Sequence, residues 1–157
     1  MTSMHTDLLS RIDQLDLPAA PPDPIGNFSN TLIVGDMLYV SGQGPVQADG
    51  TLLRGKVGTD VTAEVAYDHA RLVGLNLLAA VKKEIGDWSR FRRVVKVLGL
   101  VNATPDFTRH PTVINGCSDL LVEVFGDAGV HTRSALGVGS LPNNITVEIE
   151  AIFQIRP

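Results

Sequence analysis

Arg133 and Glu148, two oppositely charged residues near the C-terminal end of the chain, are the best candidates for a small-molecule site. Glu148 lies in the run from Thr146 to Phe153, where strand alternation sends the apolar side chains to one face and the glutamates to the other. Arg133 opens the preceding apolar run. If the two runs form a hairpin centred near Ser140 and Leu141, Arg133 lies opposite Glu148, although a slip of one residue would separate them. The pair then has two interpretations, a small-molecule site or a cross-strand ion pair that only stabilises the sheet.

Hydrophobic periodicity and turn residues predict the elements that must hold this pair. The clearest helix spans Val61 to Gly86, with Asp60 or Thr62 available to cap its start and Gly86 placed to end it. A second helix is predicted from His110 to Phe125, and a short one from Thr6 to Leu15. Strands are predicted at residues 30–34, 37–41, 93–101, 134–138 and 146–155, and the third of these is apolar enough to be buried on both faces.

The order of the main elements, β-β-α-β-α-β-β, indicates an α+β fold in which two helices pack on one face of a mixed sheet. The 157 residues match the size of one domain. Four prolines between Leu17 and Pro24 break regular structure. We therefore expect residues 1–24 to form a helix and a Pro-rich linker, and residues 25–157 to form the main domain.

Composition narrows the class of protein. Hydrophobic residues make up 44% of the chain and charged residues 19%, which is typical of a folded globular protein. The net charge of −4 and the scattered basic residues argue against a partner with a phosphate backbone, so no nucleic acid is expected. No apolar run approaches the roughly 20 residues that span a bilayer. The first 17 residues lack the cationic start of a signal peptide, so we expect no membrane partner and a cytoplasmic location.

Other reactive residue types are better explained by structure. Cys117 lies in a predicted helix without a neighbouring histidine, which indicates a buried thiol rather than a nucleophile. No two histidines have metal-ligand spacing, so no metal site is expected. His131 lies two residues before Arg133 and therefore on the same strand face. It either tunes the charge of the site or forms a solvent-exposed strand end, and the second interpretation is preferred. Trp88, just after a helix end, is expected to be a packing anchor.

Three sequence motifs resemble those of a known family. The run from Val40 to Pro45 (VSGQGP), the run from Thr132 to Ala135 (TRSA) and the run from Val147 to Ile152 (VEIEAI) are similar to motifs of the Rid/YjgF family of enamine/imine deaminases. The resemblance extends from about Ile25 to Arg156. The C-terminal motif is the more specific one, because it joins an arginine, a Leu-Pro turn and the Glu-Ile-Glu-Ala strand.

The resemblance implies a chorismate-mutase-like fold, a homotrimer with sites between subunits, and no cofactor or metal. A trimer would also cover the face of the sheet that one layer of helices leaves open. The implied reaction is the hydrolysis of 2-aminoacrylate-like enamines and their imines to 2-keto acids and ammonia. By resemblance, Arg133 would bind the substrate carboxylate and Glu148 would activate water. The substrate-binding residues implied by the resemblance are Phe28, Ser41, Gly42, Asn115 and Ala135.

Departures from the family pattern mark a longer, divergent branch. Phe28 replaces a frequent tyrosine, and Ala135 replaces a frequent cysteine. His131 and Thr132 replace small or proline residues before Arg133. Two other functions are therefore kept beside deamination: a non-catalytic trimeric module that binds small carboxylates or stabilises proteins, and the ribonuclease activity attached to some relatives, against which the acidic balance argues. Neither the physiological substrate nor the role of the N-terminal helix follows from the sequence.

Overall fold

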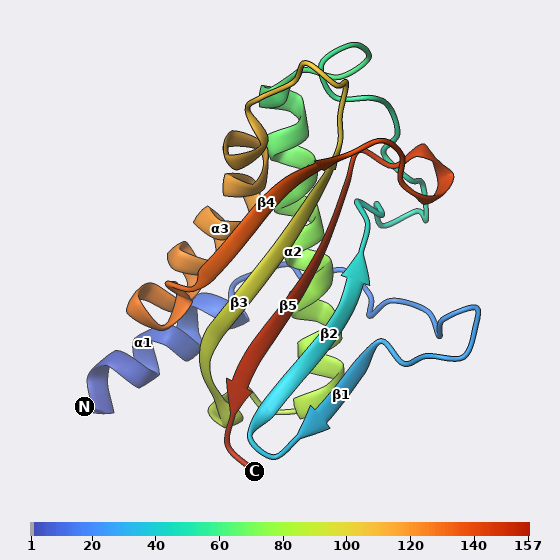
Figure 1. Cartoon of the computed structure of the whole chain (residues 1–157). Helices are drawn as coiled ribbons and strands as arrows, with labels where there is room; N and C mark the ends of the chain where they lie inside the picture. The colour runs from blue at the N-terminus through green and yellow to red at the C-terminus, as the bar shows by residue number, and fades with distance from the viewer. Residues whose placement is uncertain (1) are drawn as a thin grey trace.

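The computed structural model describes residues 2–157, with side chains from residue 6 onward. It is a five-stranded sheet covered on one face by two long helices, with a third, N-terminal helix outside them (Figure 1). The helices are α1 (Thr2–Asp13), α2 (Ala63–Ile85) and α3 (His110–Phe125), and the strands are β1 (Thr31–Val34), β2 (Met37–Gln43), β3 (Phe91–Asn102), β4 (Thr132–Val138) and β5 (Val147–Ile155). Short 3-10 turns are η1 (Trp88–Arg90), η2 (Gly126–Gly129) and η3 (Pro142–Asn144). The predicted α+β class and the order of the main elements are confirmed.

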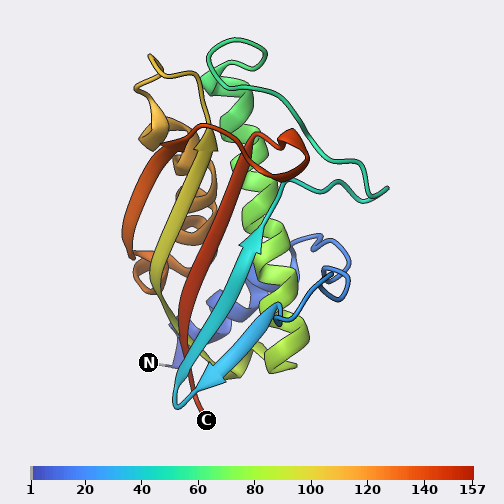
Figure 2. The ribbon, with the colours of Figure 1, turned by 45° about the vertical axis from the view of Figure 1, so that its right-hand side comes forward.

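The order of strands in the sheet differs from the sequence order. It is β1-β2-β5-β3-β4, so β5 lies in the middle and β4 at an edge (Figure 2). β4 runs parallel to β3, to which α3 connects it, and β5 runs antiparallel to both β2 and β3. The predicted hairpin of the last two strands is therefore wrong. The crossover through α3 places β4 on one side of β3, and β5 occupies the other side, where it pairs with two strands instead of one.

Helix α2 begins and ends where its capping residues require. Of the two candidate caps, Thr62 is the one used, because its hydroxyl accepts a hydrogen bond from the backbone N–H of Val65 at 3.2 Å. At the other end Gly86 has φ +73°, a left-handed conformation that glycine adopts without steric cost, and its N–H bonds the carbonyl of Lys82. The predicted range, 61–86, was thus wide by two residues at its start and one at its end.

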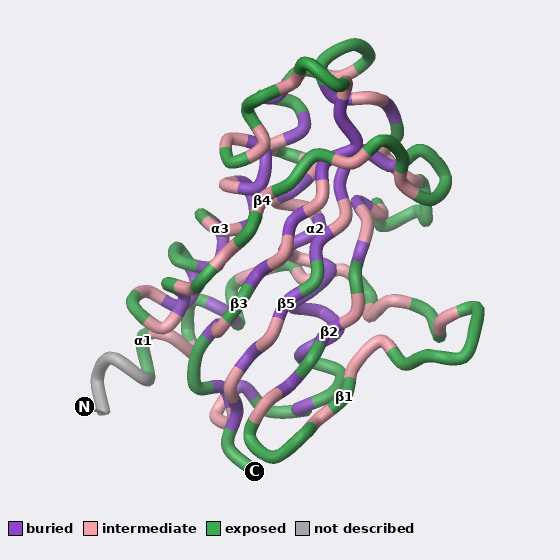
Figure 3. Tube along the Cα trace, viewed as in Figure 1, coloured by how far each residue is buried: buried purple, intermediate pink, exposed green. Residues whose placement is uncertain are grey.

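The core lies between the sheet and the two long helices (Figure 3). Along β5 the apolar residues Val147, Ile149 and Phe153 are completely buried against the helices, while Glu148 and Glu150 alternate toward the other face. Trp88 is 4% exposed and packs with Phe91 and Phe125, so it is the packing anchor that was predicted.

The face of the sheet that points away from the helices is open in the single chain. The prediction that β3 is buried on both faces is wrong, because Lys96 is exposed there and Leu98 and Leu100 are half-buried. Further apolar side chains continue this surface, which we call the open face; its members are Leu32, Tyr39, Leu98, Leu100, Leu136 and Ile152. A contiguous apolar surface of this kind is typical of an interaction surface.

The N-terminal helix α1 packs on the outer side of α3. Ile12 is only 2% exposed and belongs to the core cluster, and Arg11 donates to the backbone carbonyl of Glu123 on α3 at 3.4 Å. The proline-containing segment then returns to the sheet, where Asn30 donates to the carbonyl of Pro22 at 2.8 Å. The two ends of the segment that carries Phe28 are thus bonded to each other.

Close contact between α2 and α3 depends on a glycine. A Cβ atom added at Gly116 would overlap the backbone carbonyl oxygen of Tyr67 on α2. Because backbone cannot move aside as a flexible side chain can, we expect Gly116→Ala to lower the free energy of unfolding by about 1–3 kcal/mol. Chemical denaturation measures this loss. Gly139→Ala is the matched control, since nothing lies within 4 Å of its added Cβ; an equal loss in both variants would contradict the packing argument.

Candidate functional site

Arg133 is held on the helix side of the sheet. Its Nη1 donates to Asn115 Oδ1 at 2.7 Å and to Ser118 Oγ at 3.1 Å, and both acceptors lie on α3. These two bonds use both hydrogens of Nη1. Within residues 6–157 we find no carboxylate paired with Arg133 and no hydrogen bond from its Nε or Nη2. The guanidinium therefore keeps one complete donor edge for an external anion.

His131 adjoins Arg133 and is not the exposed strand end that was preferred from the sequence. The ring is half-buried, with Nδ1 at 2.6 Å from the carbonyl oxygen of Gly129 and Nε2 at 2.9 Å from Ser118 Oγ. Burial lowers its pKa, an effect that the Gly129 bond opposes and the charge of Arg133 reinforces. The expected placement on the same face as Arg133 is confirmed, because both side chains contact Ser118.

Glu148 projects from β5 toward the face opposite to the helices. Its side chain is half-buried and packs on the backbone of Gly42, where an added Cβ would lie 3.0 Å from the carboxyl carbon. Burial raises the pKa of Glu148, and the nearby negative charge of Glu150 raises it further. A carboxylate with a raised pKa, and with no cationic partner among residues 6–157, is suited to accept a proton from a reacting molecule.

Arg133 and Glu148 do not meet within one chain. Arg133 pairs across β3 through Val97 with Ala151, three residues from Glu148 along β5. The two residues are thus separated by two interstrand steps across the sheet and by three residues along the strand direction. At usual strand dimensions their Cα atoms lie roughly 14 Å apart. The side chains also leave opposite faces of the sheet, since Arg133 bonds α3 while Glu148 alternates with the buried Val147. The prediction that they lie opposite one another, and the interpretation as a cross-strand ion pair, are therefore wrong.

A bulge in β2 places Ser41 and Gly42 beside the glutamates. Between Val40 and Gln43 the strand β2 advances three residues while β5 advances two, so one extra residue bends the strand. Ser41 Oγ donates to the carbonyl of Ser29 at 2.6 Å, and its N–H donates to the carbonyl of Asn30 at 2.8 Å. These bonds tie the loop before β1 to the bulge.

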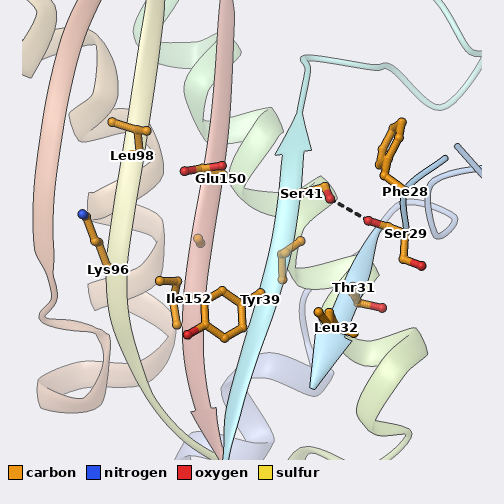
Figure 4. Close-up of a pocket in the computed structure, with 12 residues that line it drawn as sticks. Phe28, Ser29, Thr31, Leu32, Tyr39, Ser41, Lys96, Leu98, Glu150 and Ile152 are labelled. Atoms are coloured by element: carbon orange, nitrogen blue, oxygen red, sulfur yellow. Dashed lines mark hydrogen bonds between the residues drawn. The ribbon is translucent and has the colours of Figure 1, made fainter. Parts of the chain in front are cut away.

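A hollow of about 590 Å³ lies on the open face beside this bulge (Figure 4). Phe28, which is 57% exposed, stands at one side of it, and Ser41, Tyr39 and Glu150 line it from neighbouring strands. The figure shows the Phe28 ring standing apart from the sheet, on the side of Ser41 and Ser29. Glu148 and Gly42 do not line this hollow; they contact each other next to it, one residue beyond Ser41 on β2 and two residues before Glu150 on β5. We call Phe28, Ser41, Gly42 and Glu148 the base half-site.

Ala135 belongs with the other group. It follows Arg133 by two residues on β4, so its side chain faces the helices, where it packs against the core. β4 is an edge strand, whose outward backbone groups have no strand partner and can bind a ligand or a second chain. We call Arg133, Asn115 and Ala135 the arginine half-site.

Other reactive groups have structural surroundings. Cys117 is completely buried, and burial raises the pKa of its thiol to about 12, against a smaller opposing effect of Arg133. The thiol is therefore protonated at neutral pH, as expected of a structural cysteine. In the part of the chain that the structure describes, no three His, Cys, Asp or Glu side chains gather as metal ligands. No helix among the described residues is long and apolar enough to cross a bilayer.

Comparison with known proteins gives a consistent set of relatives. The family model described as YjgF/chorismate mutase-like, a description that also names an endoribonuclease, matches residues 10–152. The Trypanosoma cruzi protein TCP17 is 37% identical over 143 residues, which cover 90% of this chain and 89% of that protein. A 2-iminobutanoate/2-iminopropanoate deaminase of Dermatophagoides farinae is 31% identical over 135 residues, covering 86% of this chain and 91% of that protein.

A solved structure extends the likeness to three dimensions. The crystal structure of a protein of unknown function from Agrobacterium tumefaciens matches with a TM-score of 0.86 at 39% sequence identity. The match covers 98% of this chain and 96% of that protein. The likeness therefore includes the N-terminal extension as well as the sheet and its helices.

Proposed function

Since the chain belongs to the Rid/YjgF family, we propose that it hydrolyses small imine or enamine carboxylic acids to 2-keto acids and ammonia. The observation that carries this proposal is that one chain holds two chemically complementary half-sites, on opposite faces of its sheet. One presents a guanidinium edge that has no counter-ion within residues 6–157, and the other presents a half-buried carboxylate with a raised pKa. A relative named as a 2-iminobutanoate/2-iminopropanoate deaminase supports the reaction class.

In the proposed reaction the substrate carboxylate binds the Nε and Nη2 edge of Arg133 as a bidentate pair. Glu148 accepts a proton from water as the water oxygen attacks the imine carbon. That proton then passes to the imine nitrogen and gives a carbinolamine. The hydroxyl proton of this intermediate is transferred to the amino nitrogen, again through Glu148, the carbon–nitrogen bond breaks, and the carbon–oxygen double bond of the 2-keto acid forms as ammonia leaves. Backbone groups at Gly42 and Ala135 would orient the substrate, and Phe28 would form an apolar wall. Because imines hydrolyse readily, orientation and proton transfer are sufficient catalysis.

The separation of the half-sites supports a site formed between two copies of the chain. Arg133 and Glu148 leave opposite faces of one sheet, so a substrate that contacts both must lie between two subunits. We therefore propose a homotrimer in which the arginine half-site of one subunit meets the base half-site of the next. The open face supports this assembly, because Leu32 and Leu136 are 60% and 50% exposed in the single chain. A monomeric mass by light scattering at micromolar concentration would contradict it.

The direct test is the release of ammonia from 2-iminopropionate generated in the assay by an amino acid oxidase. Wild-type protein is expected to shorten the lifetime of the imine and to form pyruvate and ammonia in equal amounts. A well-folded oligomer that binds pyruvate but leaves the imine lifetime unchanged would instead indicate the non-catalytic carboxylate-binding module. Phe28, which lacks a hydroxyl group, would then be the first residue to examine.

The raised pKa of Glu148 predicts a pH profile. Glu148 must be ionised to accept a proton, so kcat/KM is expected to fall as the pH drops through its folded-state pKa, which lies above the ordinary value of 4.5. Burial is the larger cause and the charge of Glu150 the smaller. Glu150→Gln removes the smaller cause and is expected to move the acidic limb to lower pH while the rate above that limb stays unchanged.

The matched control for this shift is Glu123→Gln on the exposed surface of α3, where the carboxylate accepts a hydrogen bond from Arg71 at 3.1 Å. It also removes one negative charge, so it corrects for the change in net charge. An acidic limb that moves equally in both variants, or that moves in neither, would contradict the assignment of Glu148 as the base.

A further inference from the structure

A chain of hydrogen bonds leads from the backbone at Gly129 to the guanidinium of Arg133. The carbonyl of Gly129 can only accept, so His131 Nδ1, at 2.6 Å, donates to it. In the neutral ring Nε2 is then an acceptor, and the hydroxyl of Ser118, at 2.9 Å, donates to it. The Ser118 oxygen in turn accepts from Arg133 Nη1 at 3.1 Å. Along this series of hydrogen bonds, the neighbour of each group determines whether that group donates or accepts.

Only the neutral form of His131 completes this arrangement. A protonated ring would donate from Nε2 as well, and the Ser118 hydroxyl would have to turn its hydrogen away. Three further observations favour the neutral ring: it is half-buried, Arg133 on β4 lies beside it, and Arg93 on β3 donates to the carbonyl of the adjacent Val130 at 3.1 Å. The tautomer is thus set by the backbone and the charge state by the surroundings.

We propose that His131 is a positioning residue which, through Ser118, orients Arg133 so that its Nε and Nη2 edge faces the substrate carboxylate. This inference rests on the proposed role of Arg133 in substrate binding. Asn115 alone would leave the guanidinium free to turn about its bond to that residue. With Ser118 as the second acceptor, both hydrogens of Nη1 are fixed and the plane of the guanidinium is defined. His131 supplies the acceptor that keeps the lone pairs of Ser118 turned toward Arg133.

The experiment measures carboxylate affinity and catalysis separately. Pyruvate binding by calorimetry gives Kd, and the imine assay gives KM and kcat. His131→Phe removes both ring nitrogens, while His131→Gln keeps an oxygen that can accept from Ser118, and Ser118→Ala cuts the link itself. His131→Phe and Ser118→Ala are expected to raise Kd and KM about 3- to 10-fold with kcat within about twofold, as for the loss of one network hydrogen bond. His131→Gln is expected to restore the affinity.

A double-mutant comparison distinguishes positioning from a structural effect. If His131 acts through Ser118, the variant with both His131→Phe and Ser118→Ala binds pyruvate no more weakly than either single variant. In an Arg133→Ala background, where residual kcat/KM in the imine assay is the readout, adding His131→Phe is expected to lower kcat/KM no further. Additive losses, or a wild-type Kd in His131→Phe, would overturn the proposal. If His131→Phe fails to fold, the comparison of Ser118→Ala with His131→Gln decides.

The two proposals fail in different ways. Wild-type protein that binds pyruvate without accelerating imine hydrolysis contradicts the deaminase function but leaves the Kd measurements valid for His131. Wild-type activity together with an unchanged Kd and KM in both His131→Phe and Ser118→Ala contradicts the positioning role alone.

Discussion

Arg133→Ala is expected to lower kcat/KM for 2-iminopropionate by roughly 30-fold to a few thousandfold, the effect of removing one partner of a desolvated charge pair. The loss follows from the free donor edge of Arg133, because no other cation is bonded to Asn115 or Ser118 within residues 6–157. Pyruvate binding should become undetectable at concentrations that saturate the wild type. Steady-state kinetics and calorimetry measure the two effects independently.

Arg133→Lys is the informative companion. Lysine keeps the charge but lacks the planar fork that binds a carboxylate through two parallel bonds, so an intermediate affinity is expected. Assembly and thermal stability should remain close to wild type in both variants, since the bonds of Arg133 are to two neutral side chains of a half-buried site. If Arg133→Ala instead dissociates or unfolds the protein while Arg133→Lys is fully active, Arg133 has a structural role and the binding proposal fails.

Glu148→Gln is expected to lower kcat by about 100- to 10,000-fold, the range for loss of a general base, with little change in pyruvate affinity. Glutamine has nearly the same shape, so the contact with Gly42 is preserved and only the ability to accept a proton is lost. The contrast with Arg133→Ala is the test: one variant loses affinity, the other loses turnover. A Glu148→Gln variant with wild-type kcat would remove this residue from the mechanism.

Mixing the two inactive variants tests where the site is formed. When Arg133→Ala and Glu148→Gln subunits are dissociated together and reassembled in equal amounts, about a quarter of the interfaces should pair an intact arginine half-site with an intact base half-site. Activity should return to about that fraction of wild type. A mixture that stays inactive although mass spectrometry shows mixed oligomers would mean that each site takes both residues from one subunit.

Local patterns were sufficient to predict most elements of this fold. The range of α3 is the one expected from periodicity. Thr62 caps the start of α2 and Gly86 caps its end, and each cap depends on the chemistry of a single residue type. The alternation along β5 also places Glu148 and Glu150 on the face away from the core, as expected. These features depend on neighbours within a few residues, which a sequence displays directly.

The relation between strands could not be predicted in the same way. A hairpin is the simplest connection after the Leu-Pro turn, yet β4 pairs in parallel with β3, because a strand that follows a crossover helix can return beside the strand before it. Because β4 pairs with β3 and not with β5, Arg133 lies two strands away from Glu148. His131 was misjudged for a related reason. Its partner Ser118 lies 13 residues earlier on α3, and only the packing of that helix on β4 brings the two together.

The central position of β5 has a consequence for how the protein is made. β5 follows all the other strands in synthesis, yet it separates β2 from β3. Until it leaves the ribosome, a nascent chain holds two incomplete halves, the β1–β2 hairpin and the β3–α3–β4 unit, each with an unpaired apolar strand edge. At ordinary elongation rates the interval between completing β4 and completing β5 is roughly 1 to 3 seconds. During that interval each unpaired edge can pair with a strand of another chain, until β5 fills the place between β2 and β3.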